Sequence, residues 1–226
     1  MIRNGTVKER AARYSILLRF YQRYLNDADT ARFIASIAGH YSLGTLQRLL
    51  TSGEIYSKRA AALALGLVGD ESCYPLLGPL LRHPDRKLRL VVDDAIRAIS
   101  SREGTASQRQ LLESIVRSNE CGNFEKTIEM STQLLQSSGG LSEAYHQRSL
   151  ALFQVDEIEN AIADCRQALK LNEFHYAAMV GLGHCHLELG ELIEALFWFR
   201  RSVEIYPDLE PVRAQIRQLE KAIQEL

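Results

Sequence analysis

The sequence predicts an all-α protein built as an α-solenoid, a stack of antiparallel helix pairs. Three observations lead to this fold class. Apolar residues recur at helical spacing along most of the 226 residues. Two internal repeats of different period, a shorter one and then a longer one, divide the chain. The chain has 14 Gly and 5 Pro, too few for a Gly/Pro-rich all-β protein.

The charge is divided unequally along the chain. The net charge is −1 overall, but residues 1–103 carry 16 Lys and Arg against 10 Asp and Glu. Residues 104–226 carry 11 Lys and Arg against 18 Asp and Glu. An overall charge near zero argues against an obligate nucleic-acid binder. The division predicts two modules, residues 1–103 and 104–226, joined by the polar segment 100–108.

In the N-terminal module, helices are expected near residues 8–25 and 30–38. The shorter repeat follows them, and its period superposes Leu46 on Leu77 and Leu50 on Leu81. Residues 58–70 and 88–100 resemble the second helix of HEAT repeats, of the short bacterial lyase-like kind. Asp85 followed by Arg89 resembles the acid–Arg ladder of that family.

The first predicted helix interleaves basic residues with tyrosines and leucines. This pattern can bind nucleic acid or an anionic membrane surface. A helix that caps the solenoid would have the same pattern, and we favour the cap. Its apolar stripe would consist of Val7, Ala11, Tyr14, Leu18, Tyr21 and Leu25.

In the C-terminal module, the longer period aligns three units without a gap: 108–141, 142–175 and 176–209. Each unit contains two helical stretches, separated by turns at 122–123, 156–157 and 190–191. In the middle unit the helices are expected at 143–154 and 158–171. A helix that begins at Pro211 has one apolar stripe and is expected to cover the last unit.

These units resemble tetratricopeptide repeats, a family whose helix pairs stack into a right-handed superhelix. The third unit matches the family pattern best, with Met179, Leu182, Gly183, His186, Ala195, Phe199, Ser202 and Pro207. In the second unit Arg148 and Ser149 replace the Leu–Gly pair of the family. The first unit keeps Leu111, Phe124, Ile128 and Leu134.

The resemblance implies a concave groove lined by the first helix of each unit. Its predicted partner-binding residues are Leu112, Val116, His146, Leu150, Phe153, Val180, His184 and Leu187, with Asn119 at an equivalent position. Glu120, Gln154 and Glu188 would form the edge. Family members that grip a peptide carboxylate use Lys, Asn and Arg at such positions. Those cations are missing, so we expect a partner segment that is apolar with basic flanks. Alternatively, Leu150 and Phe153 pack on a neighbouring helix.

A second candidate surface lies at Phe197-Trp198-Phe199. Consecutive helical residues point about 100° apart, so one buried face cannot hold all three rings. Phe199 matches the core aromatic of the family, so Phe197 or Trp198 should be partly exposed. We favour packing of these rings against the end helix, and a homodimer contact is the alternative.

No residue pattern predicts catalysis, a cofactor or a metal site. His184 and His186 lie about 200° apart on a helix and cannot share an ion. No carboxylate or cysteine with ligand spacing accompanies His146 and His184. His40, His83 and His175 are expected at solvated turns. Asp93-Asp94 is interpreted as part of a charge ladder.

The sequence therefore predicts a non-enzymatic adaptor or scaffold that binds a protein or peptide segment. The alternative is nucleic-acid or anion binding by the basic half, although nucleic acid is the less favoured partner. A third reading is an accessory subunit of a bilin-lyase-like enzyme, because the HEAT-like units resemble those linked to bilin attachment. No apolar run reaches the length of a membrane span. The four cysteines are expected to be free thiols, and the protein is expected in the cytoplasm.

Overall fold

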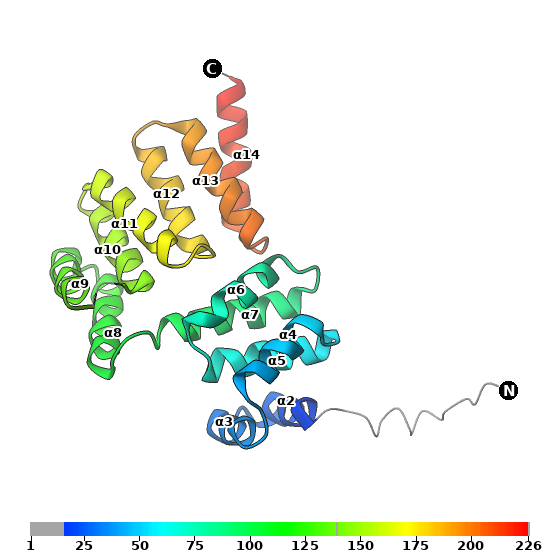
Figure 1. Ribbon diagram of the computed structural model, residues 1–226. Coiled ribbons are helices and arrows are strands. Elements are labelled where there is room, and N and C mark those ends of the chain that lie inside the picture. The colour runs from blue at the N-terminus through cyan, green and yellow to red at the C-terminus, as the bar shows by residue number, and fades with distance from the viewer. Residues whose placement is uncertain (1–15, 139, 226) are drawn as a thin grey trace. The chain divides into compact units, whose positions relative to one another are not determined.

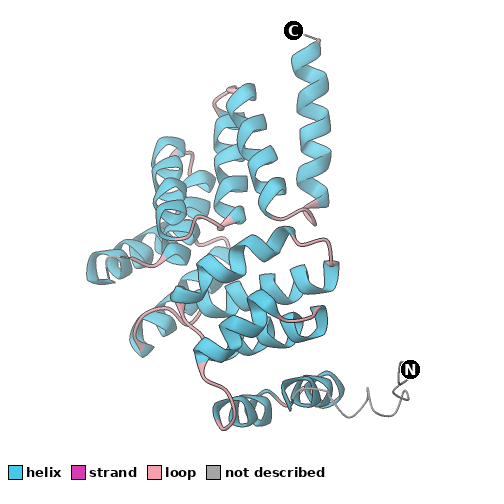
Figure 2. Ribbon diagram, turned by 45° about the vertical axis from the view of Figure 1, so that its right-hand side comes forward, coloured by secondary structure: helices cyan, strands magenta, loops and turns pink. Residues whose placement is uncertain are grey.

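The structure is a computed structural model that describes residues 16–138 and 140–225. All thirteen α-helices and both 3₁₀ helices found there are joined by short turns, and no strand occurs in these ranges. The predicted all-α fold of paired helices is confirmed (Figures 1 and 2). The chain forms two compact units, residues 1–98 and 99–226, which are described separately.

The first unit contains helices of unequal length, and two of its shortest elements contain Pro75 and Pro79. Its elements are α2 (Ile16–Asp27), α3 (Thr30–Ala38), α4 (Leu43–Ser52), α5 (Ile55–Val68), η1 (Glu71–Cys73), α6 (Tyr74–Leu77), η2 (Gly78–Arg82) and α7 (Arg86–Ser100), whose last residues belong to the second unit. Pro79 lacks a backbone N–H, and the α6 helix gives way to a 3₁₀ turn there. Gly66 of α5 allows close approach to α7, since a Cβ at this position would lie 2.6 Å from Ala95.

The predicted apolar stripe of the first helix is partly wrong. Leu17 and Tyr21 are the buried residues of α2, whereas Leu18 is half-buried and Leu25 is 63% exposed. The buried face is therefore centred one residue away from the predicted stripe, and Leu25 lies in the last turn of the helix. Val7, Ala11, Tyr14 and the basic residues before Ile16 lie outside the described residues.

The second unit is a row of helix pairs in which each helix packs on the next (Figures 1 and 2). Its helices are α8 (Ala106–Glu120), α9 (Phe124–Ser138), α10 (Ser142–Gln154), α11 (Ile158–Leu171), α12 (Tyr176–Glu188), α13 (Leu192–Ile205) and α14 (Glu210–Gln224). The predicted helices of the middle unit agree with α10 and α11 to within one residue.

The three turns inside the helix pairs share one backbone conformation. Gly122, Asp156 and Gly190 occupy the same position in successive repeats and have φ of 73°, 65° and 74°. Glycine adopts this left-handed region without a Cβ penalty, whereas Asp156 occupies it as one of the few residue types that tolerate it. The turn geometry thus repeats even where the residue does not.

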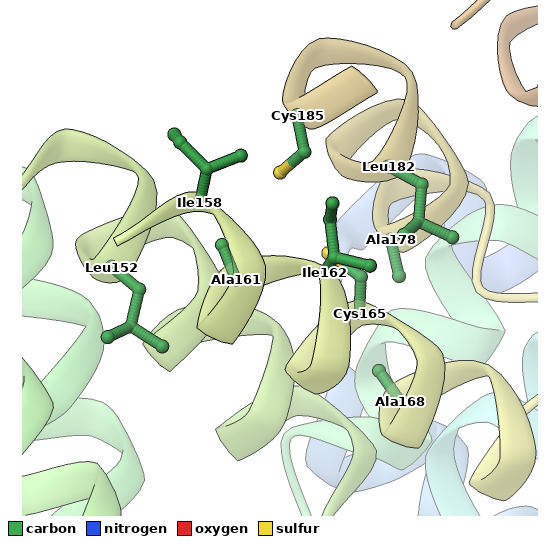
Figure 3. Close-up of a cluster of buried hydrophobic side chains, with 9 residues drawn as sticks. All are labelled: Leu152, Ile158, Ala161, Ile162, Cys165, Ala168, Ala178, Leu182 and Cys185. Atoms are coloured by element: carbon green, nitrogen blue, oxygen red, sulfur yellow. The ribbon is translucent and has the colours of Figure 1, made fainter. Parts of the chain in front are cut away.

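The core of this unit lies between successive helix pairs. Figure 3 shows one cluster, in which small residues of α11 face α12. Its members are Leu152, Ile158, Ala161, Ile162, Cys165, Ala168, Ala178, Leu182 and Cys185. At the end of the row, Val212 and Leu219 of α14 pack against Phe199 of α13. This end helix covers the last repeat, as the sequence predicts.

Candidate functional site

A hollow of about 420 Å³ lies between the first helices of two successive units, α8 and α10. Its lining residues are Val116, Asn119, Glu120, Phe124, Gln147, Leu150, Phe153 and Gln154. Three of the predicted groove residues, Val116, Leu150 and Phe153, therefore meet around one depression. Glu120 and Gln154 lie at it too, where the sequence places the edge of the groove.

The apolar residues in and near this hollow differ in how much of their side chain is exposed to solvent. Leu150 is 40% exposed and shares the hollow with the apolar side chains of Val116 and Phe153. Phe153 is half-buried and packs against the core cluster of Figure 3, so it contributes both to the core and to the hollow. Leu112, by contrast, is buried in the core between α8 and α9 and lies beneath the surface.

A chain of amide hydrogen bonds crosses the hollow. The Asn119 side-chain amide donates to the Gln147 carbonyl oxygen and to Gln147 Oε1, each at 2.8 Å. Gln147 Nε2 then donates to Glu143 Oε1 at 2.7 Å. Asn119 Oδ1 is buried and has no hydrogen-bond partner among the described residues. The hydrogen bonds of Asn119 and Gln147 thus connect α8 to α10 at the hollow.

The predicted groove residues of the third unit lie elsewhere. Val180 and Leu187 are partly buried against the cluster formed by α13 and α14. The His184 ring packs edge-on against Phe199 with centroids 5.1 Å apart, and burial lowers the pKa of His184. None of the three lines the hollow between α8 and α10.

The aromatic triplet on α13 divides between core and surface. Phe199 is fully buried, Phe197 is 58% exposed, and their neighbour Trp198 is half-buried. The Phe197 and Trp198 rings contact each other, with centroids 5.2 Å apart. Trp198 packs against the cluster of α10, α11 and α12, not against α14 as expected, because its direction from the helix differs from that of Phe199 by about 100°.

The expectation for His146 and His175 is wrong. His175 is not a solvated turn residue, since its side chain is only 8% exposed. His146 is buried too, and its ring lies 4.7 Å from the His175 ring, centroid to centroid. Glu143 stands between them, with Oε1 3.5 Å from His146 Nδ1 and Oε2 3.4 Å from His175 Nε2. A carboxylate therefore does accompany His146.

The ionisation of this cluster follows from burial and proximity. Burial opposes the charged form of Glu143, but the two imidazoles that face it hold its pKa well below the ordinary value. Burial lowers the pKa of His175, and the Glu143 contact offsets part of that effect. The sequence contains one signal for this arrangement: Glu143 and His146 stand at positions i and i+3, which places them on one helix face.

The remaining titratable candidates have simple partners. His40 is exposed, and its ring packs against Phe20. Asp93 forms an ion pair with Arg97 at 3.1 Å, in keeping with a charge ladder. Asp85 binds Arg59 of the preceding helix pair through two hydrogen bonds. Cys73, Cys165 and Cys185 are buried, Cys121 is exposed, and all four are free.

Comparison with known families supports the C-terminal half of the prediction. The tetratricopeptide repeat family model matches residues 142–175 and 176–209, the second and third predicted units. These two segments are similar to tetratricopeptide repeats. The model matches neither the first predicted unit nor the HEAT-like segments, which stay predictions.

Several solved structures share helical repeats with this chain. The first tetratricopeptide domain of Spaghetti (RPAP3), bound to the HSP90 peptide SRMEEVD, has a TM-score of 0.50 and 21% identity over 52% of this chain and 93% of that chain. A thermophilic tetratricopeptide protein of Thermus thermophilus has a TM-score of 0.40 and 17% identity, covering 90% of this chain and 96% of that one. The TPR2AB domain of yeast Sti1, complexed with pHSP90, has a TM-score of 0.46 and 12% identity, covering 90% and 95%. The likeness to Spaghetti shows the fold of the part that it covers.

No curated protein sequence matches the chain. Among the helices of the described ranges, none combines the length and the apolar character that a membrane crossing requires.

Proposed function

We propose that the protein is a non-enzymatic adaptor that binds a segment of another protein in the hollow between α8 and α10. The observation that carries this proposal is the partly exposed Leu150, which shares the hollow with Val116 and Phe153. Covering this leucine with an apolar side chain removes its surface from water and favours binding by about 25 cal/mol per Å². A tetratricopeptide fold supports the class of function, since such repeats offer extended binding surfaces.

The amide groups beside the apolar residues are held in place before a partner arrives. Asn119 donates to Gln147, and Gln147 donates to Glu143. This part of the hollow is therefore pre-organised, which lowers the entropy cost of binding.

The charge of the site favours basic residues beside the apolar segment. Glu120 lies exposed at the hollow, and residues 104–226 carry an excess of acidic side chains. The peptide held by the Spaghetti domain, SRMEEVD, is acidic near its end. An acidic end of that kind would meet like charge here, so we propose the opposite preference.

The hypothesis can be tested with a displayed random-peptide library screened against the full chain. We expect enriched peptides to combine apolar residues with Lys or Arg. Leu150→Glu together with Phe153→Glu should weaken their binding at least tenfold, because charges would replace the apolar surface. Leu171→Glu is the matched control, since Leu171 is 44% exposed on α11, outside the hollow. Equal binding by the folded double variant would disprove this site, and enrichment of acidic peptides would disprove the charge preference.

The exposed face of α13 favours a second function, self-association. Phe197 and Ile193 lie one turn apart on this helix, and both are more than half exposed. Two copies that pair these residues would bury an aromatic anchor of the kind enriched in interfaces. Light scattering of the full chain and of Phe197→Glu tests this proposal: a dimer that the variant converts to a monomer supports it, and a monomeric parent rejects it.

The proposed location is the cytoplasm. All four cysteines are free, and three of them are buried in the packed helices. Unpaired thiols are typical of a reducing compartment. Imaging of a fluorescent fusion in the source cell tests the location.

A further inference from the structure

We propose that Glu143, His146 and His175 form a binding site for a divalent transition-metal ion of the Zn²⁺ type. Glu143 and His146 come from the first two turns of α10, and His175 comes from the residue directly before α12. The ion would therefore connect the N-terminal part of α10 to the N-cap residue of α12. This site lies beside the proposed peptide hollow, because Gln147 lines the hollow and also donates a hydrogen bond to Glu143.

The spacing of the ligand atoms is the first argument. One nitrogen of each imidazole and one oxygen of the carboxylate lie within 4.8 Å of one another. Glu143 Oε1 lies 3.5 Å from His146 Nδ1, and the other oxygen, Oε2, lies 3.4 Å from His175 Nε2. Two ligands bound to Zn²⁺ at tetrahedral angles are about 3.4 Å apart, whereas charge-assisted hydrogen bonds are shorter, about 2.7–2.9 Å. Each carboxylate oxygen thus stands at the separation of metal ligands from one imidazole nitrogen.

The donor set is the second argument. Two imidazoles and a carboxylate suit Zn²⁺ and neighbouring transition metals, whereas Ca²⁺ and Mg²⁺ require mainly oxygen ligands. The His146 and His175 side chains are about nine-tenths buried, which keeps the ligands from freely hydrating. A fourth tetrahedral position remains for water or for a partner's side chain.

The support around the carboxylate is the third argument. Gln147 Nε2 donates to Glu143 Oε1 at 2.7 Å, and Asn119 of α8 holds Gln147 in turn. Outer groups of this kind orient metal ligands in proteins, and their loss typically weakens metal affinity about 10–100-fold. The orientation of Glu143 is therefore fixed by Gln147 of α10 and, through Gln147, by Asn119 of α8.

One hydrogen bond must be given up when the ion binds. His175 caps α12, because its Nδ1 accepts the backbone N–H of Ala178 at 3.2 Å. Coordination through Nε2 moves the ring proton to Nδ1, which can then no longer accept. The loss of one N-cap bond changes a folding equilibrium by about fivefold. Structural zinc sites change it by many orders of magnitude, so the ion prevails over the cap.

The test uses the full chain with Cys121→Ser, which removes the exposed thiol as a competing ligand. After treatment with a chelator, the protein is titrated with Zn²⁺ by calorimetry and with Co²⁺ by visible absorption. We expect one equivalent of Zn²⁺ to bind, tetrahedral Co²⁺ absorption that Zn²⁺ displaces, and a rise in Tm with Zn²⁺.

Two variants remove one ligand each without disturbing the fold. His175→Asn deletes the imidazole but keeps a good N-cap residue on α12. Glu143→Gln keeps the shape of the side chain and removes its charge. Each should weaken Zn²⁺ binding at least 100-fold and abolish the Tm rise. The matched control is His186→Gln, because His186 is a buried histidine of the third repeat that pairs with Glu191 at 2.5 Å, outside the cluster. Micromolar Zn²⁺ that fails to bind, or equal binding by the folded His175→Asn protein, would overturn the proposal.

Discussion

The second and third repeats match the same family model, but different kinds of side chain fill the contact between their two helices. In the third repeat a Cβ added to Gly183 would overlap the ring of Phe199 on the facing helix. The equivalent positions one repeat earlier are Ser149 and Cys165, and the Cys165 thiol donates to Ser149 Oγ at 3.3 Å. The third repeat thus pairs a glycine with a large ring, whereas the second repeat pairs a serine with a cysteine.

A second pair of positions shows the same compensation. In the third repeat, Leu182 belongs to the apolar cluster of Figure 3 and Trp198 packs against that cluster. Their counterparts in the second repeat, Arg148 and Asp164, form a two-pronged ion pair at 2.7 Å and 2.8 Å. The comparison teaches that the repeat requires complementary partners across its two helices, not a particular residue at each position.

Removing one charge of that ion pair should produce the largest effect. Asp164 has a side chain that is only 7% exposed, so Arg148→Leu leaves a buried carboxylate without its partner. We expect a loss of about 3–5 kcal/mol in the free energy of unfolding. Urea denaturation followed by circular dichroism measures it.

The double variant Arg148→Leu/Asp164→Leu gives the second repeat the apolar chemistry of the third. Replacement of a buried ion pair by apolar residues is often neutral, so most of the stability should return. If the double variant is as unstable as the single one, the two repeats are not alternative solutions of one packing problem.

An intermediate effect is expected at the close contact of the third repeat. Gly183→Ala places a methyl group against the Phe199 ring and should cost about 1–3 kcal/mol. In a Phe199→Leu background the same substitution should cost less, because the smaller side chain leaves room. A double-mutant cycle on thermal or urea unfolding gives the coupling. Strictly additive effects would mean that the two residues do not determine each other.

The smallest effect is expected at the equivalent contact of the second repeat. Ser149→Ala removes a neutral hydrogen-bond acceptor of Cys165 and should cost about 0.5–1.5 kcal/mol. Burial raises the pKa of the Cys165 thiol to about 12, although the Ser149 contact acts in the opposite direction. The native thiol should therefore stay unreactive toward Ellman's reagent at pH 8 in both proteins. Rapid labelling of Cys165 in Ser149→Ala alone would show that this contact protects the thiol.

The sequence predicts the helices well because their positions depend on local periodicity. The repeat register places α11 at 158–171, where the structure has it, and α3 agrees with the predicted residues 30–38. The stripe on α2 is misplaced at one position, because the described helix buries Leu17 instead of Leu18. An apolar stripe can shift by one residue when few turns define it.

The site is less predictable because it depends on contacts between units. Val116, Leu150 and Phe153 line one hollow, since Val116 and Leu150 occupy equivalent repeat positions and Phe153 lies about one turn after Leu150. His175 approaches Glu143 only because the loop before α12 returns beside the first turn of α10. One of these residues lies in a helix and the other in a loop, so no shared periodicity could reveal their contact.

The repeated turns at Gly122, Asp156 and Gly190 have a consequence for the history of such a chain. Each of them reverses the chain with one left-handed residue, at the same position of its repeat. A unit copied or removed by recombination at this spacing would leave its neighbours with unchanged entry and exit directions. Asp156 shows that the unit tolerates a residue other than glycine there, so duplicated copies can diverge in sequence while the backbone path is inherited intact.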